Sequence, residues 1–223
     1  MDWQALILSL ELATVTLLVL LPAGLWLGRC LAYTRLAAKP WIEALVVLPL
    51  VLPPTVLGYY LLVSMGGASP VGAWVQQHLG LRLTFNFLGL LIASIVFNIP
   101  FLVQPVQRAF EAIPRQLAEA AAVSGLSAWQ TFLRIELPLA WPGVLSACVL
   151  TFVHTLGEFG VVLMVGGSIP GETKTIAIAI YDRVQAFDTS AAGTMALALL
   201  VVSFVTVALS FVLSDRWLRS DRR

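Results

Sequence analysis

Residues 119–138 read EAAAVSGLSAWQTFLRIELP, a polar-interrupted segment between long apolar runs. Pro114, just before this segment, suits the first turn of a helix, because the N–H that proline lacks would have no partner there. From Arg115 to Ser124 the chain is rich in alanine and favours a helix. We expect Gly125 to end this helix in a left-handed conformation, with the hydrophobic Leu126 packing back against it.

A second short helix is predicted after this glycine. Ser127 and Gln130 fit a capping box, in which the serine side chain caps the first turn and the glutamine reaches back to the serine backbone. We expect the helix to run to about Arg134 and to be ended by Pro138. The segment therefore encodes a helix, a glycine corner and a second helix.

The first of these helices offers a small, flat surface. We expect Ala120, Ala121 and Ala122 to form it, with the charge of Glu119 beside them. A soluble partner can approach the backbone closely at such a surface. An ordinary helical hairpin between two spans fits the same features when they are considered alone.

The composition is that of a membrane protein. Of the 223 residues, 59% are apolar and 11% are charged, and the mean hydropathy is +0.92, whereas soluble domains carry about a quarter charged residues. Five apolar runs reach the roughly 20 residues that a helix needs to cross a bilayer. The predicted spans are 5–28, 41–65, 85–106, 141–165 and 191–213. We therefore predict an all-α, polytopic transmembrane bundle in contact with lipid, with one domain over residues 1–223.

The basic residues are distributed unevenly between alternate connections. One side receives Arg29, Arg35, Lys39, Arg108, Arg115, Arg134, Arg216, Arg219, Arg222 and Arg223. The other side receives Arg82, Lys174 and Arg183. Because cytoplasmic loops carry the excess of Lys and Arg, we expect a multi-pass protein of the cell (inner) membrane. Its N-terminus is predicted to lie outside, and its C-terminus and residues 108–140 in the cytoplasm.

The second predicted span contains several prolines. Pro49, Pro53 and Pro54 remove backbone hydrogen bonds, and Gly58 follows them, so we expect this helix to be kinked or locally unwound near its middle. Such a break is tolerated in lipid where protein or a water-filled cavity satisfies the freed carbonyls. A kink that only helps packing and a kink that lines a pathway are both consistent with the sequence.

Three formal charges fall within the predicted spans, namely Glu11, Glu43 and Glu158. The first two lie near span ends and can reach the membrane surface. Glu158 follows His154 by four residues, so both can share one helical face, and Gly157 and Gly160 leave room for another backbone. An ionisable residue inside a span is a functional candidate. A proton relay or contact with the substrate is one interpretation, and a structural or gate role with hydrogen bonds from neighbouring backbone is the other.

The chain resembles the permeases of ABC importers, specifically those for molybdate. Their cytoplasmic coupling loop has the pattern E-A-A-x₃-G-x₉-I-x-L-P, and every fixed position is filled here, by Glu119, Ala120, Ala121, Gly125, Ile135, Leu137 and Pro138. Three further stretches carry the resemblance, LPLVLPPTVLGY at 48–59, LGEFG at 156–160 and IPGETKT at 169–175. The five-span count and the short chain suit the same family.

The resemblance implies a type I ABC importer permease fold and a set of partners. Two permease copies, here expected to be a homodimer, would form one pathway. Each would dock on one of two cytoplasmic ATPase subunits through Glu119, Ala120, Ala121 and Gly125. An extracytoplasmic protein would deliver the oxyanion. ATP and Mg would bind the ATPase, since this chain has no GxxxxGK[ST] loop.

The expected function is therefore oxyanion translocation, without an enzymatic activity of the chain itself. Tungstate and sulfate are alternative substrates. No cofactor, metal site or nucleic-acid partner is predicted. Candidates for lining or gating the pathway are Pro53, Pro54, Thr55, Ser94, Asn98, Thr151, His154, Thr155, Glu158 and Ser168.

Two other classes of protein are weaker interpretations. A secondary transporter of the inverted-repeat type would show internal symmetry and matched broken helices, which this sequence lacks. An intramembrane enzyme would carry a motif such as HExxH or GxSxG, and neither is present.

Overall fold

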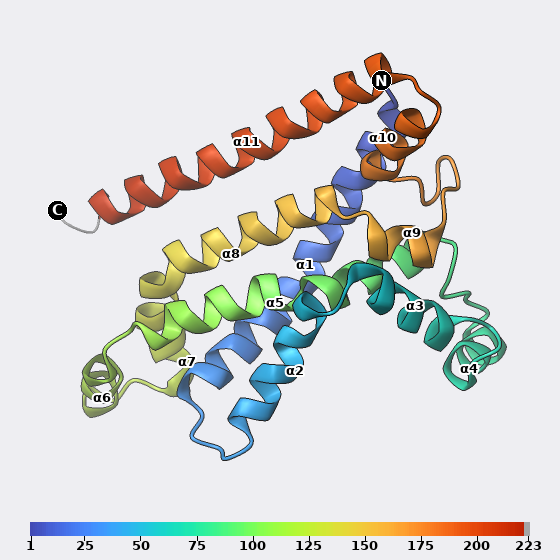
Figure 1. Cartoon of the computed structure of the whole chain (residues 1–223). Coiled ribbons are helices and arrows are strands. Elements are labelled where there is room, and N and C mark those ends of the chain that lie inside the picture. The colour runs from blue at the N-terminus through green and yellow to red at the C-terminus, as the bar shows by residue number, and fades with distance from the viewer. Residues whose placement is uncertain (221–223) are drawn as a thin grey trace.

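The computed structural model describes residues 1–220, apart from the side chains of Ala118 and of residues 214–220. Every regular element in this described part is a helix (Figure 1), which confirms the all-α prediction. In chain order the elements are α1 (Trp3–Tyr33), α2 (Lys39–Val51), α3 (Pro54–Met65), α4 (Pro70–Leu79), α5 (Phe87–Glu111), α6 (Arg115–Val123), α7 (Ala128–Thr131), the π-helix η1 (Phe132–Glu136), α8 (Leu137–Gly157), α9 (Gly160–Gly166), α10 (Ile176–Gln185) and α11 (Thr189–Ser220).

Within the described residues, 4 helices are long and apolar enough to cross a membrane. They are α1, α5, the continuous helix Ala128–Gly157 made of α7, η1 and α8, and the Thr189–Leu213 part of α11. A fifth candidate consists of α2 and α3 together. All five predicted spans are therefore represented, although α1 and α5 run further than expected at their carboxyl ends.

Helices α1, α5 and α8 pack together around the largest apolar cluster. Val106 and Phe110 of α5 and Val144 of α8 are fully buried in it. Gly28 lets α1 approach α5 closely, because a Cβ at this position would lie 2.7 Å from Val106 Cγ1 and 3.1 Å from the backbone nitrogen of Gln107. Helices α2, α9, α10 and α11 each contact at least one member of this three-helix core.

The second predicted span is broken into two helices. Helices α2 and α3 meet at an angle of 105°, with Leu52 in an extended conformation (φ −70°, ψ 139°) and Pro53 capping α3. Two consecutive prolines supply no N–H donors to continue the helix, which explains the break. The predicted interruption is confirmed, but a single kinked helix over 41–65 is wrong.

The fourth span begins earlier than predicted and passes straight through Pro138. We expected this proline to end a separate short helix, and that expectation is wrong. The preceding turn is π-helical, with Leu137 N–H donating to Phe132 O. A proline ring displaces the carbonyl four residues before it, and a widened turn accommodates that displacement without ending the helix.

The same span also ends earlier than predicted. Helix α8 stops at Gly157, Glu158 and Phe159 are non-helical, and α9 starts at Gly160. Glycine has low helix propensity, and glycines on both sides of the joint make this the weakest point of the run. The predicted continuous helix over 141–165 is therefore two helices with a joint.

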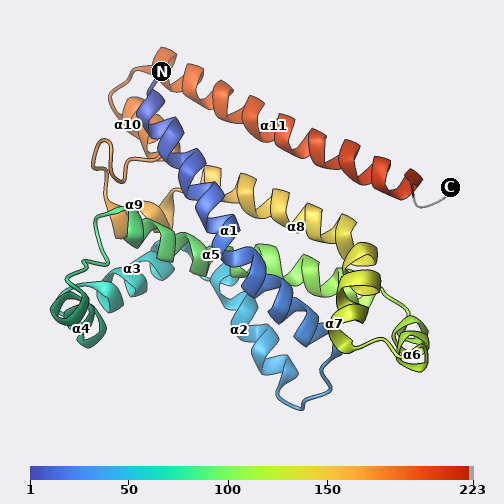
Figure 2. The same ribbon diagram turned by 180° about the vertical axis from the view of Figure 1, so that it is seen from behind.

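The two ends of the bundle carry different elements. Figures 1 and 2 agree that α6 and α7 lie at one end, whereas α4, α9, α10 and the N-terminus lie at the other. Helix α11 starts near the N-terminus and runs toward the end that carries α6. Of the basic residues counted for orientation, Arg222, Arg223 and the side chains of Arg216 and Arg219 lie outside the described part.

Helix α11 is largely uncovered by the rest of the chain. Only 6% of its apolar window is buried, and the side chains of Leu200, Phe204 and Phe211 are more than half exposed. In a membrane such an apolar surface faces lipid tails or another protein subunit.

Candidate functional site

The segment at 115–131 has the predicted helix–glycine–helix form. Gly125 has φ +77°, and two backbone bonds close the end of α6: Gly125 N–H donates to Ala122 O and Leu126 N–H to Ala121 O, both at 3.0 Å. This pair of bonds is the Schellman motif, which satisfies the last carbonyls of a helix. Pro114 precedes the first turn of α6 as its N-cap rather than lying inside that turn.

The predicted capping box at the start of α7 is also present. The Ser127 hydroxyl accepts from Gln130 N–H at 3.3 Å, and the Gln130 side chain accepts from Ser127 N–H at 2.9 Å. On both sides of the corner, the free backbone groups at the helix ends are thus hydrogen-bonded within the segment itself.

The surface of α6 differs in one respect from the prediction. Glu119, Ala120 and Ala122 are exposed, but Ala121 is 3% exposed and faces inward. Three consecutive alanines cannot all point outward, because successive side chains on an α-helix lie about 100° apart. The exposed small surface is therefore made by Ala120 and Ala122, and Ala121 packs against its own chain.

The remaining motif residues lie outside this exposed corner. Ile135 is in η1, and Leu137 and Pro138 open α8. Leu137 packs against the core cluster that α1, α5 and α8 share. The motif thus combines an exposed part on α6 with a part that joins it to the bundle. Residues 115–136, from the start of α6 to the end of η1, form a unit that we call the coupling segment.

An ion pair ties the coupling segment to α1. Arg29 Nε lies 2.5 Å from Glu136 Oε2 and Arg29 Nη2 lies 3.2 Å from Oε1, a bidentate geometry that is stronger than a single contact. Glu136 is only 3% exposed. The guanidinium also lies 5.5 Å from the ring centroid of Tyr33 and 5.4 Å from that of Phe132.

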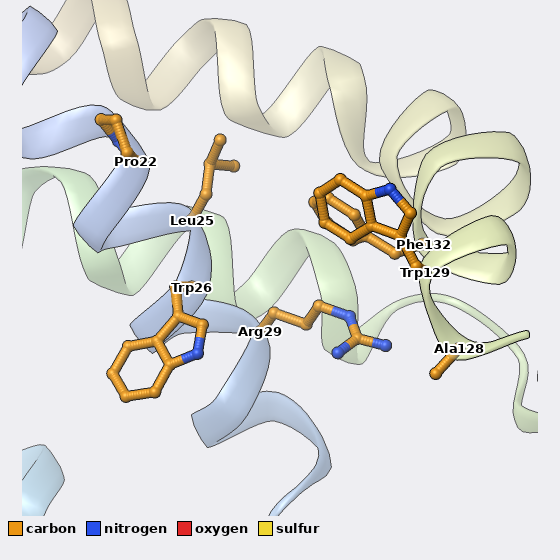
Figure 3. Close-up of a pocket in the computed structure, with 7 residues that line it drawn as sticks. All are labelled: Pro22, Leu25, Trp26, Arg29, Ala128, Trp129 and Phe132. Carbon is orange, nitrogen blue, oxygen red and sulfur yellow. The ribbon is translucent and has the colours of Figure 1, made fainter.

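Figure 3 shows how Arg29 reaches from α1 toward Phe132 and Trp129. These three residues and their neighbours line a mainly apolar cavity of about 420 Å³ between α1 and the coupling segment. Sequence reasoning missed the pair because its partners are 107 positions apart. The available signal was a lone carboxylate, Glu136, between the apolar Ile135 and Leu137.

A second polar cluster lies at the end of α5, just before the coupling segment begins. Glu111, the last residue of α5, accepts from Gln107 Nε2 at 2.8 Å and from Arg108 Nη1 at 2.8 Å. Lys39 Nζ at the start of α2 lies 3.2 Å from the same carboxylate, and Gln107 also donates to Glu43 at 2.6 Å. This cluster therefore joins the carboxyl end of α5, which leads into the coupling segment, to the start of α2.

A cavity of about 570 Å³ lies toward the other end of the bundle, where α3, α5, α8 and α9 meet. Four of the predicted pathway residues line it: Pro54, Thr55, His154 and Glu158. Gly160 lets α9 approach α3, since a Cβ there would lie 2.9 Å from Pro54 Cβ. The broken ends of two helices thus meet at one cavity, which is mainly apolar but receives the side chains of Thr55, His154 and Glu158.

Glu158 is bound by side chains and not by the backbone donors we expected. Its Oε2 accepts from Ser94 Oγ at 3.0 Å and from Asn98 Nδ2 at 3.4 Å. His154 and Glu158 do not share a helical face, because α8 ends between them. They are linked through Asn98, whose Oδ1 lies 3.1 Å from His154 Nδ1.

The other predicted pathway residues are placed differently. Thr151 and Thr155 are buried within α8, where Thr155 Oγ1 donates to the carbonyl of Thr151 at 2.8 Å. Pro53 forms the break between α2 and α3 without lining the cavity. Ser168 lies in the connection before α10, bonded to Asp182 at 3.2 Å, so it is remote from the cavity.

A helical bundle with an exposed corner at one end and a cavity between broken helices has the features of a membrane transport subunit. The family described as "binding-protein-dependent transport system inner membrane component" matches residues 21–219. The chain belongs to this family. It is accordingly a multi-pass inner-membrane permease.

Several curated relatives align with nearly the whole chain. The molybdenum transport system permease protein ModB of Azotobacter vinelandii is 47% identical over 207 residues, which cover 92% of this chain and 91% of the relative. ModB of Escherichia coli K12 is 35% identical and covers 97% of this chain and 93% of the relative. The sulfate permease CysT of the same organism is 33% identical over 184 residues, which cover 82% of this chain and 65% of CysT.

Solved structures with the same fold are membrane subunits of ABC importers. A bacterial transporter that imports the polysaccharide alginate superposes with a TM-score of 0.79 at 20% identity, over 96% of this chain and 78% of the other. The inward-facing MetNI methionine transporter superposes with a TM-score of 0.70 at 17% identity, over 97% and 94%. The type I ABC importer permease fold predicted for this chain is therefore confirmed.

Proposed function

We propose that this permease translocates molybdate, in a complex of two copies of the chain with two cytoplasmic ATPase subunits and an external binding protein. The observation that carries the substrate assignment is the 47% identity to a molybdenum permease over 92% of the chain. ATP binding belongs to the ATPase, because no phosphate-binding loop is present in the sequence.

The coupling segment is the proposed docking surface for the ATPase. Glu119 and Ala120 offer a charge and a small surface on α6, and Gly125 sets the corner that presents them. The other motif residues join this surface to the bundle; they are Ala121, Ile135, Leu137 and Pro138. The ion pair of Arg29 with Glu136 joins the segment to α1, so we expect the segment and this span to move together.

The proposed orientation follows from the same arrangement. The ATPase side must be cytoplasmic, so the end with α6 faces the cytoplasm and the end with α4, α9, α10 and the N-terminus faces outward. The basic residues of the connections are divided in the same way.

The oxyanion pathway is proposed to pass the cavity between α3, α5, α8 and α9. Pro54 and Thr55 come from one broken helix, and His154 and Glu158 from the other. The described spans hold no Lys or Arg side chain in this cavity, which suits a pathway that must release a dianion quickly.

Reconstitution tests the proposal directly. Proteoliposomes that contain the permease, its ATPase and the molybdate-binding protein should accumulate labelled molybdate only when ATP and all three components are present. Uptake driven by a proton gradient without the ATPase would contradict the importer assignment. Sulfate or tungstate uptake in preference to molybdate, with the matching binding protein, would contradict the substrate assignment alone.

A further inference from the structure

Glu158 has an unusual environment for a carboxyl group at membrane depth. The residue is 4% exposed. One oxygen, Oε2, accepts two hydrogen bonds from neutral donors, the Ser94 hydroxyl and the Asn98 amide. The other oxygen, Oε1, is buried and has no hydrogen-bond partner in the described part of the structure.

No counter-charge reaches this carboxyl. Among the described side chains no Lys or Arg forms an ion pair with Glu158 or lines the adjoining cavity. The titratable group nearest in the hydrogen-bond network is His154, which faces Asn98 from α8 and does not contact Glu158. From α5 the carboxyl meets Ser94 and Asn98, and from α3 the cavity receives Pro54 and Thr55, all of them uncharged.

A buried charge without a partner is strongly unfavourable, and a group in that position takes up a proton instead. The hydrogen-bond pattern agrees with a neutral acid. Its carbonyl oxygen, taken as Oε2, can accept both bonds, and no donor among the described residues reaches Oε1 to stabilise a carboxylate there. A neutral acid at this place also removes the repulsion that a carboxylate would exert on a passing dianion.

We propose that Glu158 is a proton-binding site beside the pathway, and that its neutral form joins α5 to the joint between α8 and α9 during transport. The part that concerns transport rests on the proposed function. Loss of the proton places a negative charge beside the cavity, which repels a passing oxyanion, so oxyanion uptake falls as the pH rises.

Infrared spectroscopy of the purified permease–ATPase complex in lipid nanodiscs tests the protonation without any transport assay. The C=O stretch of a protonated carboxyl, which a carboxylate lacks, should be present near neutral pH and absent in Glu158→Gln. Glu172→Gln, which removes an exposed carboxylate of an outer connection, is the matched control and should keep the band. Equal spectra for the wild type and Glu158→Gln would overturn the proposal.

Uptake by proteoliposomes tests the consequence for transport. Glu158→Gln keeps a neutral acceptor for Ser94 and Asn98 and cannot lose a proton, so its uptake should not fall with rising pH as that of the wild type does. Its uptake relative to the wild type should rise with pH. An assembled Glu158→Gln complex whose uptake falls with rising pH as steeply as that of the wild type would refute the neutral form as the working state.

Two further variants test the same proton site if the Glu158→Gln permease does not assemble with the ATPase. Ser94→Ala and Asn98→Ala each remove one donor to Oε2, so each should shift the frequency of the C=O band in the infrared spectrum. An unshifted band in both variants would overturn the assignment. A wild-type complex that shows the band but transports no molybdate would contradict the proposed function while leaving the proton site in place.

Discussion

Replacement of Gly125 by valine should weaken ATPase binding without disturbing the bundle. The φ of +77° is costly for any residue with a Cβ, and that cost is about 1–2 kcal/mol for an ordinary L-residue and greater for a β-branched one. A Cβ at Gly125 would meet no atom within 4 Å. The effect therefore comes from backbone conformation alone and not from a steric clash within the chain.

The expected magnitude follows from this conformational cost. A variant segment relaxes when it is free and must return to the left-handed corner when it docks, so the cost appears in the binding free energy. About 1–2 kcal/mol corresponds to a 5- to 30-fold weaker ATPase affinity. Asparagine tolerates the left-handed region best among the non-glycine residues, so affinity should fall in the order Gly125, Asn, Ala, Val.

Binding of a labelled ATPase subunit to nanodisc-embedded permease measures this series, with ATP-dependent molybdate uptake in parallel. Gly171→Val is the matched control, because Gly171 has φ +79° and equally open surroundings but lies in the connection before α10 and not in the coupling segment. It should keep wild-type ATPase affinity. Wild-type affinity in Gly125→Val, or an Asn variant as weak as the Val variant, would refute the conformational explanation.

Three further predictions concern the Arg29–Glu136 ion pair, the core and the orientation. Arg29→Ala leaves the buried Glu136 unpaired and should lower the free energy of unfolding by roughly 1–3 kcal/mol, which is measured as a lower Tm. The double variant that also carries Glu136→Gln should recover part of this loss. An unchanged Tm in Arg29→Ala would contradict a stabilising ion pair. Gly28→Val forces a clash with Val106 and the Gln107 backbone and should lower the free energy of unfolding by about 1–3 kcal/mol. Gly193→Ala in α11, where a Cβ meets no atom within 4 Å, should not lower the Tm and should raise it slightly through the higher helix propensity of alanine. In a chain without Cys30 and Cys148, a membrane-impermeant maleimide should label Glu172→Cys in intact cells but Ser124→Cys only after permeabilisation; the reverse pattern would invert the orientation.

Features with a local cause were predictable from the sequence. The Schellman end at Gly125, the capping box at Ser127 and the break at Pro53 each depend on residues within a few positions of one another. Backbone conformation and side-chain caps at such sites are decided by near neighbours. The five apolar runs were predictable for a related reason, since membrane insertion depends on the summed hydrophobicity of a segment.

Features with a tertiary cause were missed or misplaced. The Arg29–Glu136 and Lys39–Glu111 pairs join residues 107 and 72 positions apart, and no spacing rule connects them. Pro138 was expected to stop a helix, but the extra width of η1 and the packing of Leu137 on the core keep the helix continuous. Ser94 and Asn98 were recognised as polar candidates, yet their role as donors to Glu158 depends on how α5 packs beside the α8–α9 joint.

The π-helical turn η1 also determines the direction in which the coupling segment points. A turn closed by a bond from residue 137 to residue 132 contains one residue more than an α-helical turn. One extra residue rotates everything on its amino-terminal side by about 100° around the helix axis. The extra residue therefore sets the direction in which α7 and η1 present their rings: Trp129 and Phe132 line the cavity beside α1, and Phe132 also meets Phe110 of α5. Deletion of one residue in η1 would leave the chemistry of α6 intact but turn its exposed face about a quarter of a revolution away.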